Sequence, residues 1–242
     1  MRKIIFSKHV FVIAAIFIFT TYAWSASQEA VEPQAVAIET AVASAPEPFP
    51  APGQWEFTFK PDTSVISYFL AGNIHDTLGY VRTMQGSASA SILSDGRMTK
   101  AAVQFTFAAK VMNSDDAARD KRMFKKFMEI HLYPEIAFSA QSVGTGLDQA
   151  PSLAMATKGQ PIAFDLAGTL TIHGTTREII IPVTVYPENG LLITDGTTTL
   201  QLPDYTIKNP SWLFMRTEDT VKIDLHIELQ PQSQEQPIPP LD

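Results

Sequence analysis

The chain has 242 residues, of which 45% are apolar and 18% charged, so it can form a sizeable core and is not disordered throughout. It contains no cysteine, which excludes disulfides, thiolate metal sites, iron–sulfur clusters and a cysteine nucleophile. The formal net charge of −7 argues against a nucleic-acid-binding protein, because such proteins normally carry a basic face.

Residues 1–25 have the pattern of a secretory signal peptide. Arg2, Lys3 and Lys8 precede a short apolar stretch at 10–19, and small residues follow it. The apolar stretch is shorter than the ~20 residues that a membrane-spanning helix needs, so an uncleaved anchor is the weaker alternative. The sequence therefore predicts cleavage near Ser25 and a periplasmic location, or release outside the cell.

Two proline-containing segments flank the remaining sequence. Residues 26–53 are rich in Ala, Pro and Glu without steady periodicity, and residues 231–242 contain further prolines. Such segments bury too little apolar surface to offset the entropy lost on ordering. We therefore expect a disordered tether at 26–53, a disordered tail at 231–242 and one domain at 54–230.

Within this domain apolar and polar residues alternate, which is typical of strands with one buried and one solvated face. Trp55, Phe57 and Phe59, for example, alternate with Glu56 and Thr58. The pattern predicts about nine strands, near 55–59, 64–70, 87–93, 103–107, 136–143, 164–172, 179–185, 191–202 and 221–229. Glycine-containing turns at 95–96, 173–174 and 189–190 separate several of them. One-sided antiparallel strands in this number must close into a barrel or stack as a sandwich.

One segment departs from this period. Residues 114–130 open with Ser114, Asp115 and Asp116, which suit an N-cap and first turn, and continue with helix-forming residues. An apolar stripe that includes Phe124 and Phe127 is flanked by basic residues. The pattern predicts an amphipathic surface helix that caps one end of the barrel; the alternative is a basic lid that touches anionic membrane headgroups.

The titratable residues form no evident catalytic or metal-binding pattern. His75, His131, His173 and His226 lie far apart in sequence and never at metal-ligand spacing. His173 falls in a turn and His226 on the polar face of a strand, so we expect both to be solvated. His75 with Asp76 could form an acid–base pair, but a neighbouring pair in a loop is a weak signal. The sequence therefore favours a binding protein without cofactor or metal over an enzyme.

Four stretches in a fixed order carry a resemblance to a known family. They are GQW at 53–55 with KPDTSV at 60–65, the helix with YPEIAFS at 133–139, LAGTLTIHGTTREI at 166–179, and PDYTI at 203–207 before the last strand. As an ordered set, spanning about 54–230, they resemble the YceI-like family. The resemblance implies an all-β, extended antiparallel lipocalin-like barrel of about eight strands with one short amphipathic helix, which holds a polyisoprenoid chain.

The inward-facing apolar residues of such a barrel are the candidate ligand-binding residues: Phe57, Phe59, Phe105, Phe107, Phe138, Phe164, Leu166, Leu170, Ile172, Ile223, Leu225 and Ile227. Small residues at Ala88, Ala90, Ala140 and Gly168 are expected to leave room among them. An alternating pattern does not distinguish a filled barrel from a hollow one. The family resemblance favours the hollow barrel.

Three segments depart from the family pattern. The expected loop at 71–83 lacks the usual Gly-Phe pairing, and the polar insertion at 144–159 is atypical. The apolar stretch at 212–215 could gate the mouth of the barrel or simply pack.

Three hypotheses of function follow. The first is a periplasmic carrier or store of an isoprenoid lipid or quinone, with transient membrane contact through helix 114–130. The second is an envelope scaffold or interaction module with a filled barrel. The third, an enzyme with His75 as base, ranks last. The protein is expected to be a monomer or dimer.

Overall fold

The computed structural model describes residues 49–143, 147 and 150–232. The predicted signal peptide, tether residues 26–48, part of the insertion at 144–159 and tail residues 233–242 lie outside these residues. Residues 49–53, assigned above to the tether, lie inside them, and Gly53 opens the first strand.

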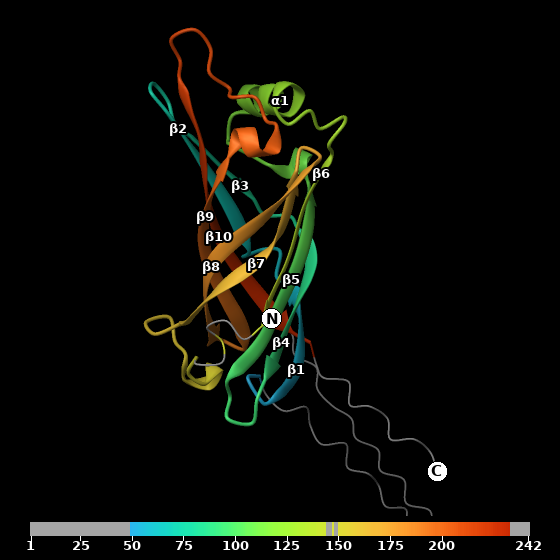
Figure 1. Ribbon diagram of the computed structural model, residues 1–242, viewed down its shortest axis with the longest axis vertical. Coiled ribbons are helices and arrows are strands. Elements are labelled where there is room, and N and C mark those ends of the chain that lie inside the picture. The colour runs from blue at the N-terminus through green and yellow to red at the C-terminus, as the bar shows by residue number, and fades with distance from the viewer. Residues whose placement is uncertain (1–48, 144–146, 148–149, 233–242) are drawn as a thin grey trace, which may run out of the picture. The chain divides into compact units, whose positions relative to one another are not determined.

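The strands are long and follow the alternation of the sequence (Figure 1). Their bounds are β1 Gly53–Phe59, β2 Val65–Gly72, β3 Thr77–Val81, β4 Gln85–Ile92, β5 Met98–Ala108, β6 Glu135–Val143, β7 Ile162–Ile172, β8 Thr175–Glu188, β9 Leu191–Gln201 and β10 Thr217–Pro231. The helical elements are α1 Ala117–Lys126 and three short 3₁₀ turns, η1 Ala109–Val111, η2 Leu153–Met155 and η3 Leu202–Tyr205.

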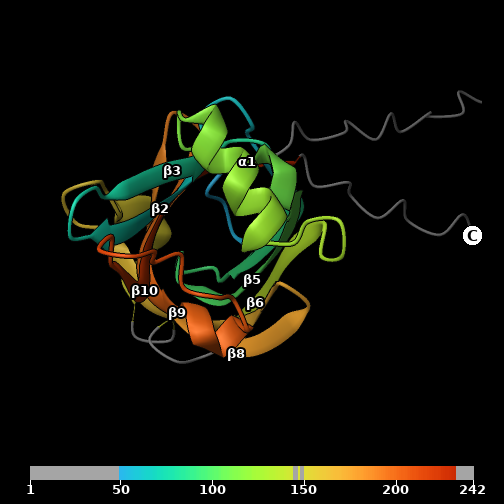
Figure 2. The same ribbon diagram turned by 90° about the horizontal axis from the view of Figure 1, so that it is seen from above.

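Eight of the strands close into an antiparallel barrel. They follow one another in the order β1-β4-β5-β6-β7-β8-β9-β10, and β10 returns to β1 through the pairs from Phe57↔Pro231 to Phe59↔Leu229. The view along the barrel shows the closed ring (Figure 2). This confirms the predicted fold class, and the closure leaves one face of each strand inside.

β1 and β2 both pair with β10, one after the other, with a short bend between them. At the bend the Ser64 hydroxyl accepts the backbone N–H of Glu228 (3.0 Å), while the Glu228 carboxylate accepts from Thr63 Oγ1 (2.6 Å) and Lys60 Nζ (3.4 Å). The hydrogen bond from Thr63 is the main cause that lowers the pKa of Glu228 below its ordinary value. The ionised carboxylate thus links Lys60 and Thr63, which lie in the bend, to β10 by hydrogen bonds.

Replacing Glu228 by glutamine is expected to lower the free energy of unfolding at pH 7 by about 1–2 kcal/mol, because hydrogen bonds to a charged acceptor are lost. A carboxyl whose folded pKa is lowered stabilises the protein above its ordinary pKa of 4.5, and this contribution is lost as the pH falls through the lower folded value. The difference in free energy of unfolding between the wild type and Glu228→Gln should therefore shrink as the pH falls below 4.5 and through the lower folded pKa of Glu228. Urea titrations from pH 7 to pH 3 measure it, with exposed Glu56→Gln as control; an equal deficit at every pH would contradict the prediction.

The predicted loop at 71–83 is wrong, since it contains strand β3, which pairs with β2 from Ile66↔Val81 to Leu70↔Thr77. Gly79 lies within this strand. A Cβ at Gly79 would lie 2.2 Å from the Tyr68 ring and 2.7 Å from the Asn113 carbonyl oxygen. The glycine therefore allows Tyr68 to cross the strand, and marks a close approach rather than a turn.

The helix is shorter than the predicted 114–130. Asp115 has a φ of +59°, which keeps residues 114–115 outside the helix, and Asp116 rather than Ser114 is the N-cap. The Asp116 carboxylate accepts the N–H groups of Ala118 and Arg119, both at 3.0 Å. Figure 2 shows α1 lying across one opening of the barrel. Among the described residues, no helix is long and apolar enough to cross a membrane.

Gly168 brings two strands together rather than leaving room in the interior, so that expectation is wrong. It pairs with Ala140, and a Cβ at Gly168 would lie 2.2 Å from the Ser139 carbonyl oxygen and 2.5 Å from Ala140 Cα. Both contacts are with backbone atoms, which cannot rotate away.

We therefore expect Gly168→Ala to lower the free energy of unfolding by about 1–3 kcal/mol through overpacking. Gly159→Ala is the matched control, because a Cβ there meets nothing within 4 Å. Chemical denaturation of the two variants measures the difference. Equal stability of both would show that β6 and β7 do not depend on the missing side chain.

Candidate ligand-binding site

The barrel encloses an apolar cavity of about 60 Å³. Twenty-one residues line it, and the polar side chains among them are Ser89 and Thr194. Pockets that hold drug-sized ligands usually measure about 300–1,000 Å³. The interior in this conformation is therefore apolar but narrow, and a long ligand requires its side chains to move.

The structure brings most of the predicted site residues to this cavity. Its lining includes Phe57, Phe59, Phe105, Phe138, Phe164, Leu166, Leu225 and Ile227. The remaining four lie outside the lining: Leu170 is buried, and Phe107, Ile172 and Ile223 are partly buried against the core. These four positions belong to the half of the barrel nearer to α1.

Three phenylalanines from three strands form the centre of the lining. The Phe105 ring of β5 lies 5.2 Å from the Phe138 ring of β6 and 6.1 Å from the Phe59 ring of β1. The first pair is tilted and the second meets edge to face, arrangements that aromatic rings favour. Phe105 therefore contacts rings from strands on both sides of β5.

Small side chains on β4 and β5 leave the space beside these rings. Ala88 and Ala90 of β4 and Ala101 of β5 line the cavity, and Ala90 pairs directly with Ala101. Ala88, Ala90 and Ala140 were all expected to leave room. The first two do line the cavity, but Ala140 is buried outside its lining, so that expectation is wrong for Ala140. The run of small residues at 86–91 and 101–102 was visible in the sequence, but its meaning depended on the register of the two strands.

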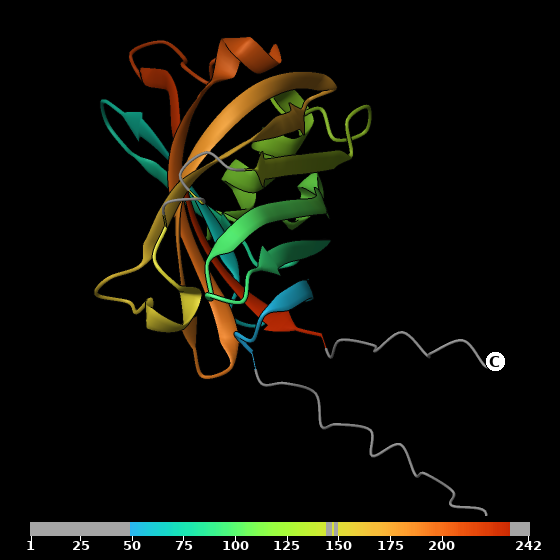
Figure 3. The same cartoon turned by 60° about the horizontal axis from the view of Figure 1, so that its bottom comes forward.

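At the end of the barrel opposite α1, which Figure 3 brings forward, the described side chains pack densely. Met98, Ile162 and Leu153 there are at most 1% exposed, and the Leu153 N–H donates to the Gly96 carbonyl oxygen at 2.7 Å. Trp55 packs edge to face on Phe49 at 5.2 Å. An apolar ligand therefore has no open path at this end of the described structure.

The interior is more accessible toward α1. Ile179, Leu200 and Ile223 share the inward side of their strands with buried residues, yet they are only half-buried. Above them lies α1, whose Met123 is partly buried and whose sulfur faces the Tyr68 hydroxyl at 3.9 Å. Burial, with the nearby Asp120 carboxylate second, raises the pKa of Tyr68. Since α1 has no fully buried residue, it covers this end without being part of the core.

His173 is not solvated as predicted, because it is buried beneath the loop that follows α1. Its Nε2 lies 3.0 Å from Glu129 Oε2, its Nδ1 lies 3.2 Å from Thr206 Oγ1, and its ring lies 4.3 Å from that of Tyr133. His173, Glu129 and Thr206 all have positive φ angles. This network joins the α1 loop to the rim of the barrel. A local pattern could not reveal it, since the partners lie 44 and 33 residues away.

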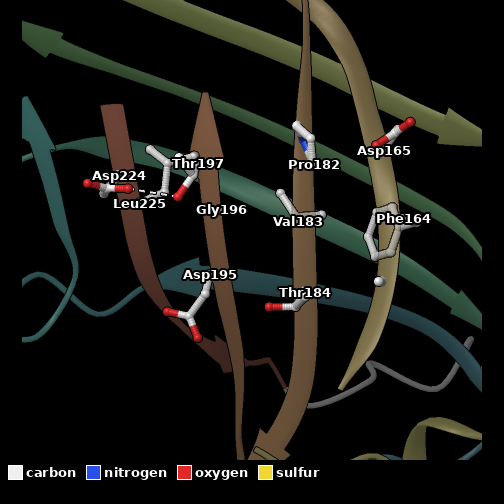
Figure 4. Close-up of a pocket in the computed structure, with 11 residues that line it drawn as sticks. Phe164, Asp165, Pro182, Val183, Thr184, Asp195, Gly196, Thr197, Asp224 and Leu225 are labelled. Carbon is white, nitrogen blue, oxygen red and sulfur yellow. Dashed lines mark hydrogen bonds between the residues drawn. The ribbon is translucent and has the colours of Figure 1, made fainter. Parts of the chain in front are cut away.

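An open trough of about 740 Å³ lies on the outside of β7–β10 (Figure 4). Asp165, Asp195 and Asp224 lie along it, and Asp165 stands between the buried Phe164 and Leu166. His226, predicted to be solvated, is 40% exposed, and its Nδ1 contacts Asp195 Oδ1 at 2.6 Å. Asp224 accepts from Thr197 Oγ1 at 2.7 Å, and this bond, followed by that from Lys222, lowers its pKa. Asp195 and Asp224 therefore interact with side chains of their own sheet.

His75 and Asp76, the acid–base pair considered in the sequence, both lie on the surface. The Asp76 carboxylate accepts the Gly72 N–H at 3.0 Å. No cluster of three or more His, Asp or Glu side chains that could hold a metal ion occurs among the described residues. The apolar lining of the barrel can exclude water from a hydrocarbon chain. It can therefore bind an apolar ligand by burying its surface.

Comparison with known proteins agrees with this geometry. The family model of the YceI-like domain matches residues 57–229. A UPF0312 protein of Pseudomonas savastanoi pv. phaseolicola is 32% identical over 125 residues, which cover 48% of this chain and 55% of that protein. The chain thus spans about half the length of the curated relatives that it matches.

Two solved structures share the fold at low sequence identity. Burkholderia cenocepacia BcnA is 18% identical with a TM-score of 0.55, and the match covers 70% of this chain and 98% of BcnA. A polyisoprenoid-binding domain from Saccharophagus degradans, implicated in plant cell wall breakdown, is 14% identical with a TM-score of 0.52. That match covers 73% of this chain and 98% of the domain.

Proposed function

The chain belongs to the YceI-like family, and we propose that it is an exported protein that holds the hydrocarbon chain of an isoprenoid lipid, such as a polyprenyl compound or quinone, inside its barrel. The observation that carries the proposal is the apolar interior, which is closed at one end and accessible below α1 at the other. The fold resemblance to a polyisoprenoid-binding domain supports it.

The lining provides the driving force for such binding. Burial of one CH₂ group contributes about 0.8 kcal/mol, so a five-carbon isoprene unit contributes up to ~4 kcal/mol before ordering costs. No charged side chain lines the described cavity. Affinity should therefore increase with the number of isoprene units and depend little on the head group.

The ligand has to enlarge the cavity as it enters. The side chains nearest to the accessible end include Met123 and Phe127, which are only partly buried and can move with α1. Methionine adapts to irregular shapes more easily than branched residues do. We propose that α1 moves aside and that the chain enters from this end, displacing the ring of Phe105.

Binding of prenyl compounds of increasing length to the mature protein tests this proposal. Quenching of tryptophan fluorescence by ubiquinones with different numbers of isoprene units measures it, since Trp55 is buried at the closed end of the barrel. The proposal predicts tighter binding with each added unit until the interior is filled. Equal affinity for the short and long compounds would contradict it.

A second candidate is a scaffold with a filled barrel, and the small cavity volume favours it. In that case the protein would bind a partner through its surface and ignore added prenyl compounds. The same titration separates the two candidates, because a filled barrel gives no saturable quenching by a compound of any length.

We propose export on the basis of residues 1–25, which lie outside the described part of the chain. N-terminal sequencing of the protein isolated from a periplasmic fraction should place the first residue near Ala26. A protein that keeps Met1 and stays with the cytoplasmic fraction would overturn this.

A further inference from the structure

The loop between η3 and β10 exposes three large apolar side chains. The Trp212 N–H donates to the Met215 carbonyl oxygen at 2.8 Å and the reverse bond measures 2.9 Å, so 212–215 form a small hairpin. Trp212, Leu213 and Phe214 are 57%, 73% and 72% exposed. The stretch therefore projects from the barrel, so the expectation that it simply packs is wrong.

The backbone of this hairpin is unfavourable for the residues that occupy it. Leu213 has a φ of +52°, in the left-handed region where tight turns normally place Gly, Asn or Asp. A bulky residue in this region is a rare and strained choice. Neither turn formation nor core packing explains leucine and phenylalanine at the tip, and such departures are expected at functional positions.

The hairpin is held firmly in place. Asn73, in the turn between β2 and β3, donates from Nδ2 to the Phe214 carbonyl oxygen at 3.0 Å and accepts the Arg216 N–H at 2.7 Å. Its own N–H donates to the Arg216 carbonyl oxygen at 3.0 Å. The adjacent Ile74 is 45% exposed. Ile74, Trp212, Leu213 and Phe214 thus form one ordered projection, which we call the apolar tip.

Cations lie at the same end of the barrel, where Figure 1 shows both α1 and the orange-red loop that includes the tip. Lys121, Lys125 and Lys126 of α1 are exposed. The carboxylates of Asp116 and Asp120 are held by hydrogen bonds within the segment, from the first N–H groups of α1 and from the Ser114 hydroxyl, and the described residues show no ion pair between either of them and these lysines. In a chain of net charge −7, this end therefore presents exposed lysines on α1 as well as the exposed apolar side chains of the tip.

We propose that this end docks on a phospholipid bilayer that contains anionic lipids, with the apolar tip inserted at the boundary of headgroups and acyl chains. Tryptophan and other large apolar side chains favour that boundary, and lysines beside them are attracted to anionic headgroups. A two-residue turn offers too little area for a stable protein interface, which buries about 800 Å² per partner, whereas insertion needs only a few side chains. Docking does not require an occupied barrel, so it stands independently of the proposed function.

Cosedimentation with vesicles tests the docking. The protein isolated from its own cell envelope is mixed with vesicles of phosphatidylethanolamine and phosphatidylglycerol, or of phosphatidylcholine alone. The proposal predicts binding to the anionic vesicles that weakens with salt and is at least tenfold weaker in Trp212→Ser/Phe214→Ser. Met155→Ser is the matched control, because Met155 is 74% exposed at the opposite end of the barrel.

The charge contribution has its own pair of variants. Lys121→Glu/Lys125→Glu should weaken binding to anionic vesicles by about tenfold, while Lys158→Glu, in the loop near η2, should not. Unchanged thermal unfolding and unchanged lipid content of all variants establish that fold and barrel are intact. Absence of vesicle binding by the native protein, or equal binding by the tip variant and Met155→Ser, would overturn the proposal. An oligomer that the tip variant dissociates, without vesicle binding, would instead assign the tip to contact between copies.

Discussion

Ala101→Phe is expected to lower the affinity for an isoprenoid chain at least 100-fold, which corresponds to ~2.7 kcal/mol. Ala101 lies on β5, pairs with Ala90 and lines the cavity. A phenyl ring there enters a space of about 60 Å³ beside the rings of Phe105 and Phe138. A ligand would then have to displace an additional ring.

The matched control is Ala167→Phe. Ala167 is exposed on β7, between the buried Leu166 and the pair of Gly168 with Ala140, so its ring would extend outward into solvent. Calorimetric titration with a polyprenol should give wild-type affinity for this control and an affinity at least 100-fold lower for Ala101→Phe. Circular dichroism establishes that both are folded. A folded Ala101→Phe variant with wild-type affinity would show that the ligand lies elsewhere.

Phe105→Ala should have the opposite effect on binding and a large effect on stability. The side chain is buried and contacts rings on β1 and β6, so its removal should lower the free energy of unfolding by about 3–5 kcal/mol. The cavity left behind needs no displacement of the ring before a chain enters. We expect affinity for a polyprenol to rise about tenfold, or ~1.4 kcal/mol.

Ile136→Ala separates the two effects. Ile136 is buried on β6 but does not line the cavity, so its truncation should destabilise the protein without tighter binding. Denaturation with and without polyprenol measures both quantities. If the ligand restores no stability to Phe105→Ala, the enlarged space is not a ligand site.

The barrel could be predicted because its strands have one buried and one solvated face. In β1, for example, Trp55, Phe57 and Phe59 are buried while their neighbours are exposed. The inward residues follow from the same alternation. The free volume does not, since it depends on how Phe59, Phe105 and Phe138 meet across the barrel, and these residues come from strands far apart in sequence.

The errors of prediction occur where tertiary contacts override local signals. Gly79 lies in a strand because Tyr68 crosses it, and Gly168 is filled by the backbone of β6. His173 is buried because residues from two distant loops converge on it. The exposure of Trp212 and Phe214 likewise depends on Asn73, which no local pattern connects to them.

Native mass spectrometry of the protein purified from its own periplasm, followed by solvent extraction, tests the central claim most directly. The account predicts one added mass per chain that extracts as a prenyl lipid and is absent from Ala101→Phe purified in the same way. A bare protein mass that also stays unchanged after incubation with quinones and polyprenols would contradict it and establish a filled barrel.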